Sequence, residues 1–169
     1  MTTIQIDKLE FSFPEDWQVT KYDDWAFYQR HFKDCCTGNK GVDLLAFDPH
    51  TRTLWLLEVK DYRLHRREKQ ARIWDEIAQK TRDTLAGLMA AQVNSSASDE
   101  RVYARRSVRA RKLRVVFHFE QPTHHSKLFP RIWDPADVQQ KLRQMMRPID
   151  PHVVVVDTQD LPKMDWTVT

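Results

Sequence analysis

The fold is decided by the stretch Gly41-Val-Asp-Leu-Leu-Ala-Phe-Asp-Pro-His-Thr-Arg-Thr-Leu-Trp-Leu-Leu-Glu-Val-Lys-Asp61. It contains two apolar runs, residues 41–48 and 53–60, on either side of the turn-forming residues 49–52. Apolar runs of this length are typical of strands, and a connection this short joins antiparallel neighbours. The stretch therefore predicts a β-hairpin.

Three charged residues occupy one end of this hairpin. Asp43 lies near the start of the first strand, and Glu58 and Lys60 lie near the end of the second. In an antiparallel pair the start of one strand lies beside the end of the other. Residues two apart share a face of a strand, so Glu58 and Lys60 point the same way while Leu57 and Val59 point the other way. We expect two carboxylates and one ammonium group to converge.

Converging carboxylates suit a hard divalent cation such as Mg²⁺, which prefers oxygen ligands. A neighbouring lysine can orient a water molecule and offset negative charge on a phosphate. The plainer alternative is a half-buried strand whose solvent face carries Glu and Lys. The apolar run Leu54-Trp-Leu-Leu57 before Glu58 and the basic region after Lys60 favour a functional site.

The rest of the chain alternates strands and helices. Alternating apolar residues predict an N-terminal hairpin within residues 1–14, and Asp23 or Asp24 precedes a helical pattern that contains Trp25, Tyr28 and Phe32. Further on, the patterns predict helices over 66–93 and 135–146 and strands over 113–119 and 152–156, with Asp134 as a helix cap. The continuous apolar run 152–156 is typical of a strand buried on both faces. Together these elements predict a single α/β domain, residues 1–169, with a mixed β-sheet flanked by helices.

Positive charge is concentrated in the middle of the chain. Residues 101–114 contain seven Lys or Arg and no acid, and we treat 94–112 as a basic insertion that forms a short helix or a loop. Such a cluster attracts phosphate backbones, although charge runs are often only solvated surface. The candidate nucleic-acid-binding residues are Arg63, Arg66, Arg67, Lys69, Arg105, Arg106, Arg109 and Arg111.

Composition excludes several classes of protein. No apolar run reaches the ~20 residues that a membrane-spanning helix needs, and the first ten residues do not form a signal peptide. The two cysteines are adjacent, Cys35 and Cys36, so they form neither a disulfide framework nor a four-ligand zinc site. With three glycines in the chain, glycine-rich phosphate loops are excluded. We expect a cytoplasmic protein.

The hairpin, with Asp43 on one strand and Glu58-Val-Lys60 on the next, resembles the core of the PD-(D/E)XK, or restriction-endonuclease-like, nuclease superfamily. The resemblance implies a restriction-endonuclease-like core, with Asp43 and Glu58 as metal-binding carboxylates, the Val59 carbonyl as a further ligand, and Lys60 as the catalytic lysine. Many members add a glutamate from the first helix. Here Asp24 and Asp34 are the available substitutes, and residues 35–37 are a candidate vestige of the usual first strand.

The resemblance further implies a nuclease that uses Mg²⁺, or Mn²⁺, to hydrolyse phosphodiester bonds, with Asp43, Glu58 and Lys60 as its catalytic residues. DNA is favoured over RNA as its substrate, and repair, recombination or defence against phage and mobile elements as its setting. A homodimer and a protein that directs the chain to its target are the partners considered. The alternative is a catalytically inactive nucleic-acid-binding or interaction domain of the same fold.

Two other groups of residues can be interpreted chemically. His118, His124 and His125 lie near Glu120 and are weaker candidates for a metal site. The adjacent cysteines, Cys35 and Cys36, are better explained as packed residues at a helix end than as nucleophiles.

Overall fold

The computed structural model describes residues 1–63, 72–122, 133–161 and 164–169. Its larger sheet has five strands in the order β3-β4-β5-β6-β7. The strands are β3 (Gln18–Lys21), β4 (Leu44–Asp48), β5 (Thr53–Asp61), β6 (Lys112–Glu120) and β7 (Val154–Val156). The pairs β3–β4 and β4–β5 are antiparallel, whereas β5–β6 and β6–β7 are parallel. The predicted α/β class with a mixed sheet is confirmed, and the restriction-endonuclease-like core stays a prediction.

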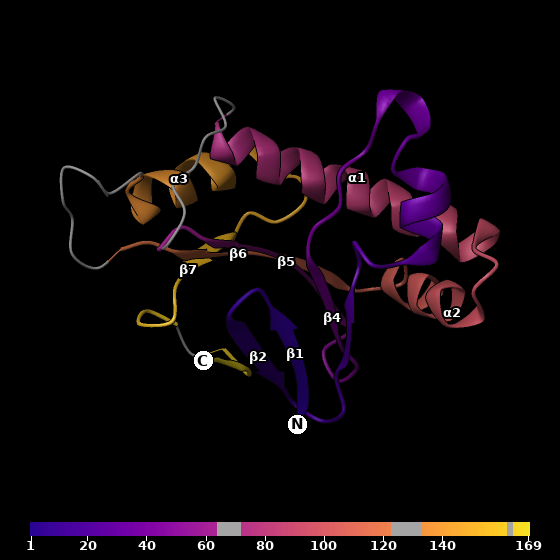
Figure 1. Ribbon diagram of the computed structural model, residues 1–169, viewed down its shortest axis with the longest axis horizontal. Helices are drawn as coiled ribbons and strands as arrows, with labels where there is room; N and C mark the ends of the chain where they lie inside the picture. The colour runs from indigo at the N-terminus through magenta and orange to yellow at the C-terminus, as the bar shows by residue number, and fades with distance from the viewer. Residues whose placement is uncertain (64–71, 123–132, 162–163) are drawn as a thin grey trace.

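The larger sheet is covered on both faces (Figure 1). The helices α1 (Ile73–Asn94), α2 (Ser98–Ser107) and α3 (Pro135–Met145) cover one face. A three-stranded sheet, in the order β1-β2-β8, covers the other and is built from β1 (Thr2–Ile6), β2 (Leu9–Phe13) and β8 (Thr167–Val168). The central strands are therefore shielded from water on both sides.

The alternation of side chains along β5 connects these two cores. Leu54 and Leu56 pack in the core on the helical side, while Leu57 and Val59 pack against the three-stranded sheet. Because side chains alternate along a strand, Glu58 shares the helical side with Leu54 and Leu56. The carboxylate at the end of β5 is thus directed toward the helices rather than toward solvent.

Several elements agree with the sequence patterns. Thr2–Ile6 and Leu9–Phe13 form the predicted N-terminal hairpin, and the 41–61 stretch forms the predicted β4–β5 hairpin. Helix α3 begins as expected, because the Asp134 side chain accepts a hydrogen bond from the Ala136 N–H. The Arg-rich stretch forms helix α2. The start of the long helix expected over 66–93 falls partly outside the described residues, and its described part begins at Ile73.

Three local predictions were wrong. The helix expected after Asp23 is only a short π-helical turn, Tyr28–Phe32, followed by a 3-10 turn, Cys35–Thr37, because the aromatic side chains pack into a cluster around Tyr22 instead of forming one continuous stripe. Residues 35–37 are therefore no vestige of a strand. Strand β3 pairs with β4 on the side opposite β5, and it was missed because Gln18-Val-Thr-Lys21 contains one apolar residue, too few to show alternation. Strand β7 is a half-buried edge strand, not one buried on both faces.

Helix α1 lies so close to Tyr22 that the glycine at the contact has no space for a side chain. A Cβ atom built on Gly87 would lie 1.9 Å from the Tyr22 hydroxyl oxygen, and the Tyr22 ring is fully buried. We expect Gly87→Ala to destabilise the protein by roughly 1–3 kcal/mol, because overpacking of a rigid ring outweighs the better helix propensity of alanine. Thermal unfolding of the variant measures this loss.

The neighbouring exposed position provides the control. Ala86→Gln changes a solvent-facing residue of the same helix and should alter stability by no more than about 0.5 kcal/mol. Equal melting temperatures for Gly87→Ala and Ala86→Gln would contradict the close packing of α1 on Tyr22.

Candidate functional site

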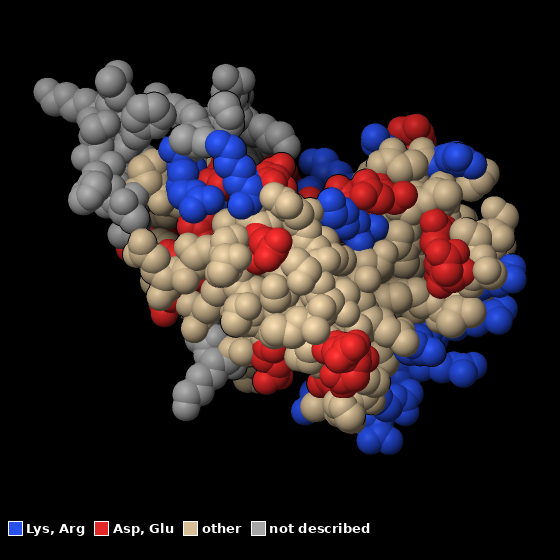
Figure 2. Space-filling model, turned by 60° about the horizontal axis from the view of Figure 1, so that its bottom comes forward, with Lys and Arg blue, Asp and Glu red and all other residues tan. Residues whose placement is uncertain are grey.

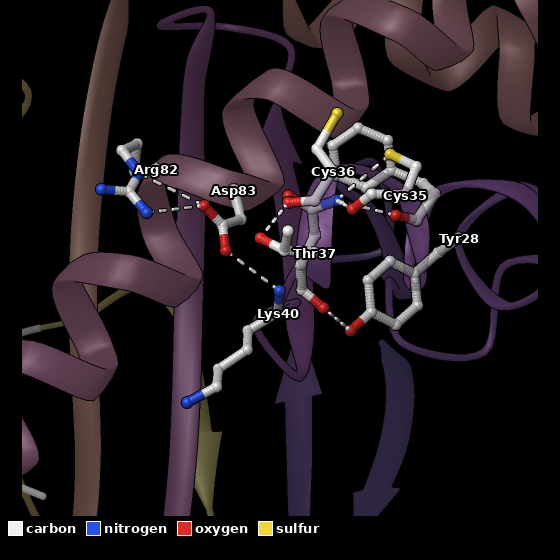
Figure 3. A network of polar contacts seen from close by, with 9 residues as sticks. Tyr28, Cys35, Cys36, Thr37, Lys40, Arg82 and Asp83 are labelled. Atoms are coloured by element: carbon white, nitrogen blue, oxygen red, sulfur yellow. Dashed lines mark hydrogen bonds and ion pairs between the residues drawn. The ribbon is translucent and has the colours of Figure 1, made fainter.

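The residues that lead into β4 are held against helix α1. The Lys40 N–H donates to the Asp83 carboxylate at 3.1 Å, and the Val42 N–H donates to the Thr84 hydroxyl at 3.0 Å. Figure 3 shows the first of these contacts, with Arg82 on the other oxygen of Asp83. These bonds fix the backbone immediately before Asp43 relative to α1.

Four charged side chains meet where β4 begins and β5 ends, and we call them the acid–lysine cluster: Asp43, Glu58, Lys60 and Lys80. The Lys60 and Lys80 ammonium groups lie 2.5 Å and 2.6 Å from the same oxygen of Glu58, Oε1. The Lys80 nitrogen is also 3.8 Å from Asp43 Oδ1. The other oxygen of Asp43 accepts a hydrogen bond from the Val59 N–H at 2.7 Å. The predicted convergence of Asp43, Glu58 and Lys60 is confirmed.

Sequence reasoning missed Lys80, which comes from α1. A signal for it does exist in the sequence. Ile73, Ile77, Thr84 and Leu88 are buried at helical spacing, and Lys80 falls within that stripe. A lysine on the buried stripe of a helix needs a buried anion, and Glu58 supplies it.

Burial controls the electrostatics of the cluster. The Glu58 side chain is 1% exposed, and burial together with repulsion from Asp43 raises its pKa to about 7, although Lys60 and Lys80 act in the opposite direction. For Lys60 burial acts to lower the pKa, but the negative charges of Glu58 and Asp43 outweigh it and raise the pKa. Lys60 therefore stays protonated and acts as a fixed positive charge rather than as a base.

A pocket of about 280 Å³ opens beside the cluster. Its lining includes Lys60, Asp43, Asp23 and Asp24, and we call it the acidic pocket. Burial, followed by the charge of Asp43, raises the pKa of Asp23. Of the two residues expected to replace the glutamate of the first helix, Asp24 lines the pocket, together with Asp23, and Asp34 does not.

The donor atoms of the acidic pocket are compatible with a hard cation. Asp23 Oδ1 is buried and has no hydrogen-bond partner among the described residues, and neither has Glu58 Oε2 in the neighbouring cluster, although Glu58 does not line the pocket. The described residues contain no group of three or more His, Cys, Asp or Glu side chains arranged to hold a metal ion. Mg²⁺ is commonly bound by one or two carboxylates and completes its shell with water or substrate oxygens. Asp43 and Asp23, which line the pocket, meet that lower requirement.

The predicted basic residues do not gather at this site. Arg63 is bound to Asp61, with its Nη2 2.6 Å from Oδ2, at one side of the acidic pocket. Arg105 and Arg106 lie on α2, with Arg109 and Arg111 just after it, and all four are exposed. Figure 2 shows Lys and Arg side chains gathered at the lower right, on the side where Figure 1 places α2. Arg66, Arg67 and Lys69 lie outside the described residues.

The described residues of the histidine group and the cysteine pair are explained by local contacts. His118 is buried, and its Nε2 lies 2.8 Å from Glu120, which also accepts from the Thr158 N–H. His124 and His125 lie outside the described residues. Cys35 contacts the Asn39 amide, and burial raises the pKa of its thiol, so it is less reactive than a free thiol.

One curated protein is similar to the whole chain. A cysteine–tRNA ligase of Neisseria meningitidis is 31% identical over an alignment 211 positions long, which covers all of this chain but only 30% of the ligase. The chain thus spans less than a third of the length of its relative. No family model and no solved structure matches the chain. No helix in the described residues has the length and apolarity to cross a membrane.

This similarity overturns the predicted function. The chain was expected to be a phosphodiester-hydrolysing nuclease of repair, recombination or defence, and its relative is instead a tRNA ligase. The nuclease prediction, with its hydrolase assignment, is therefore wrong. The acid–lysine cluster also differs from the expected one, because Lys80 adds a second ammonium group to Glu58 Oε1. Catalytic roles for Asp43, Glu58 and Lys60 and metal-binding roles for Asp43, Glu58 and Val59 stay predictions, but no longer as parts of a nuclease reaction.

The buried carboxylate predicts a pH-dependent stability. Because the pKa of Glu58 is higher in the folded state, about 7, than its ordinary 4.5, the folded protein loses stability as pH rises between these values. Glu58→Gln removes this titration. The stability of Glu58→Gln minus that of the wild type should rise by on the order of 2–3 kcal/mol between pH 4.5 and pH 8.

Denaturant unfolding across this pH range measures the difference. Glu15→Gln, at an exposed position, is the matched control and should follow the wild type at every pH. A Glu58→Gln difference that stays constant with pH would contradict the burial of this carboxylate.

Proposed function

We propose that this chain is a tRNA-binding domain of an enzyme that acts on tRNA. The observation that carries the proposal is the similarity of the entire chain to part of a cysteine–tRNA ligase. RNA replaces DNA as the favoured nucleic acid for the same reason. Because the chain corresponds to less than a third of that ligase, we assign it binding of the RNA rather than the whole ligation reaction.

The charge distribution supports this proposal. The exposed arginines on and after α2 form a surface suited to the phosphate backbone of a folded RNA. The acidic pocket would repel phosphates. It lies at the start of β4, beside Asp43, whereas the arginine surface lies near the turn that follows the end of β4. We therefore expect RNA to contact the arginine surface first.

Binding to tRNA tests the proposal directly. Fluorescence anisotropy with a labelled cysteine tRNA should show saturable binding that weakens as salt rises. A DNA duplex of similar length and charge is the control and should bind at least tenfold more weakly. Absence of tRNA binding at 50 mM salt, or equal affinity for the duplex, would contradict the proposal.

We also propose that Mg²⁺, with Mn²⁺ as a substitute, binds in the acidic pocket, with Asp43 and Asp23, which both line it, as protein ligands. The buried oxygen of Asp23 that has no hydrogen-bond partner among the described residues supports this assignment. There the ion would offset the mutual repulsion of the carboxylates, while RNA contacts the arginine surface.

A thermal-shift titration tests the metal. For a millimolar affinity, 10 mM Mg²⁺ should stabilise the wild type by about 1–1.5 kcal/mol. The same titration of Asp43→Asn should give no stabilisation, and Asp34→Asn, away from the pocket, should behave like the wild type. Equal stabilisation of all three proteins would contradict a site at Asp43.

A further inference from the structure

A second hollow, of about 390 Å³, lies at the opposite end of the β4–β5 hairpin from the acidic pocket. Four arginines line it: Arg52 from the hairpin turn, Arg105 and Arg106 from α2, and Arg109 from the segment after α2. Phe47, Pro49 and Val102 form the rest of its lining. Two elements far apart in the sequence thus direct guanidinium groups to one place.

The positive charge of this arginine hollow is not neutralised within the described part of the chain. None of the four guanidinium groups has an ion pair with a described carboxylate. The nearby Asp48 is buried and used by the turn itself, since it accepts hydrogen bonds from the backbone of His50 and Thr51 and from the Thr51 hydroxyl. The hollow therefore retains several unpaired positive charges.

The arginines are partly held in place before any ligand binds. The Arg52 guanidinium donates to the Arg109 carbonyl at 2.7 Å, and Arg105 Nε donates to the Gln92 carbonyl at 3.2 Å. Each bond uses one of the five N–H donors of an arginine and leaves the others for a ligand. A site whose groups are positioned in advance loses less entropy on binding.

The backbone of Arg52 is an independent indication. Its φ is 54°, a left-handed conformation that glycine or asparagine adopts at lower cost. The turn is stabilised by bonds from the Arg111 and Lys112 N–H groups to the Arg52 carbonyl. These bonds involve only the backbone, and the Arg52 side chain adds a single bond, to the Arg109 carbonyl. A costly arginine at a position that suits glycine is typical of a side chain retained for function.

We propose that the arginine hollow binds a phosphate group of the RNA backbone, with Arg52, Arg106 and Arg109 as its principal donors. Guanidinium groups form paired N–H···O bonds with phosphate oxygens, and phosphate contacts position a nucleic acid without reading its bases. The assignment rests on the proposed RNA-binding function and adds the place of contact.

The test compares salt-dependent binding of tRNA, of a ten-nucleotide single-stranded RNA and of inorganic pyrophosphate by wild type and variants. Arg52→Gly relieves the left-handed backbone but removes the bond to the Arg109 carbonyl, so the melting temperature should change little. It should nevertheless weaken RNA binding about fivefold or more and lower the salt slope by about one. Arg106→Ala and Arg109→Ala should act alike.

Arg147→Ala is the matched control, because it removes one exposed positive charge just after α3 and does not line the arginine hollow. It should leave the salt slope unchanged. If the wild type binds tRNA but the salt slopes of the hollow variants equal that of Arg147→Ala, phosphate binding in the arginine hollow is contradicted, while the tRNA proposal stands.

The remaining outcomes separate the two proposals further. If the wild type binds the short RNA and pyrophosphate through the hollow but not tRNA, the hollow stands and the tRNA proposal fails. If it binds none of the three probes, both proposals fail.

Discussion

The structure depends on the burial of β5 on both faces. One face packs under the helices and the other on the three-stranded sheet, so each residue of the strand must suit one of two cores. Apolar residues satisfy this requirement up to Leu57. Glu58 then places a carboxylate in the same dry environment, and an ion there is tolerated only when it is paired. The lysines from β5 and α1 meet that requirement and connect the helix to the end of the strand.

The hairpin also separates charges of opposite sign. Asp43 starts β4 beside the acidic pocket, whereas the turn that follows Asp48 carries Arg52 toward the arginines of α2. The two pockets are thus separated by the length of β4, about 17 Å for five residues. A polyanion approaching this protein meets attraction at one end of the hairpin and repulsion at the other. Such a gradient orients a charged partner before close contacts form.

The three-residue motif of the β4–β5 hairpin predicted geometry but not the reaction. The Asp43, Glu58 and Lys60 pattern predicted real geometry, because alternation along a strand and the pairing of a short hairpin are local and obligatory. The reaction assigned to that geometry came from a resemblance confined to the hairpin, and a fold or a local arrangement does not by itself specify chemistry. The similarity to part of a tRNA ligase extends over the whole chain and therefore outweighs the motif.

Elements that depend on short-range patterns in the sequence could be predicted before the structure was known. The β4–β5 hairpin, the N-terminal hairpin, the Asp134 cap and the convergence of Asp43 with Glu58 each follow from alternation, turn length or a capping side chain. Contacts between segments that lie far apart in the sequence became visible only in the folded protein. Lys80 reaches Glu58 across 22 residues of sequence, and Arg52 reaches the Arg109 carbonyl across 57. Strand β3 forms by hydrogen bonding to the edge of β4. These features arise from packing between distant segments, and no periodicity within one segment encodes them.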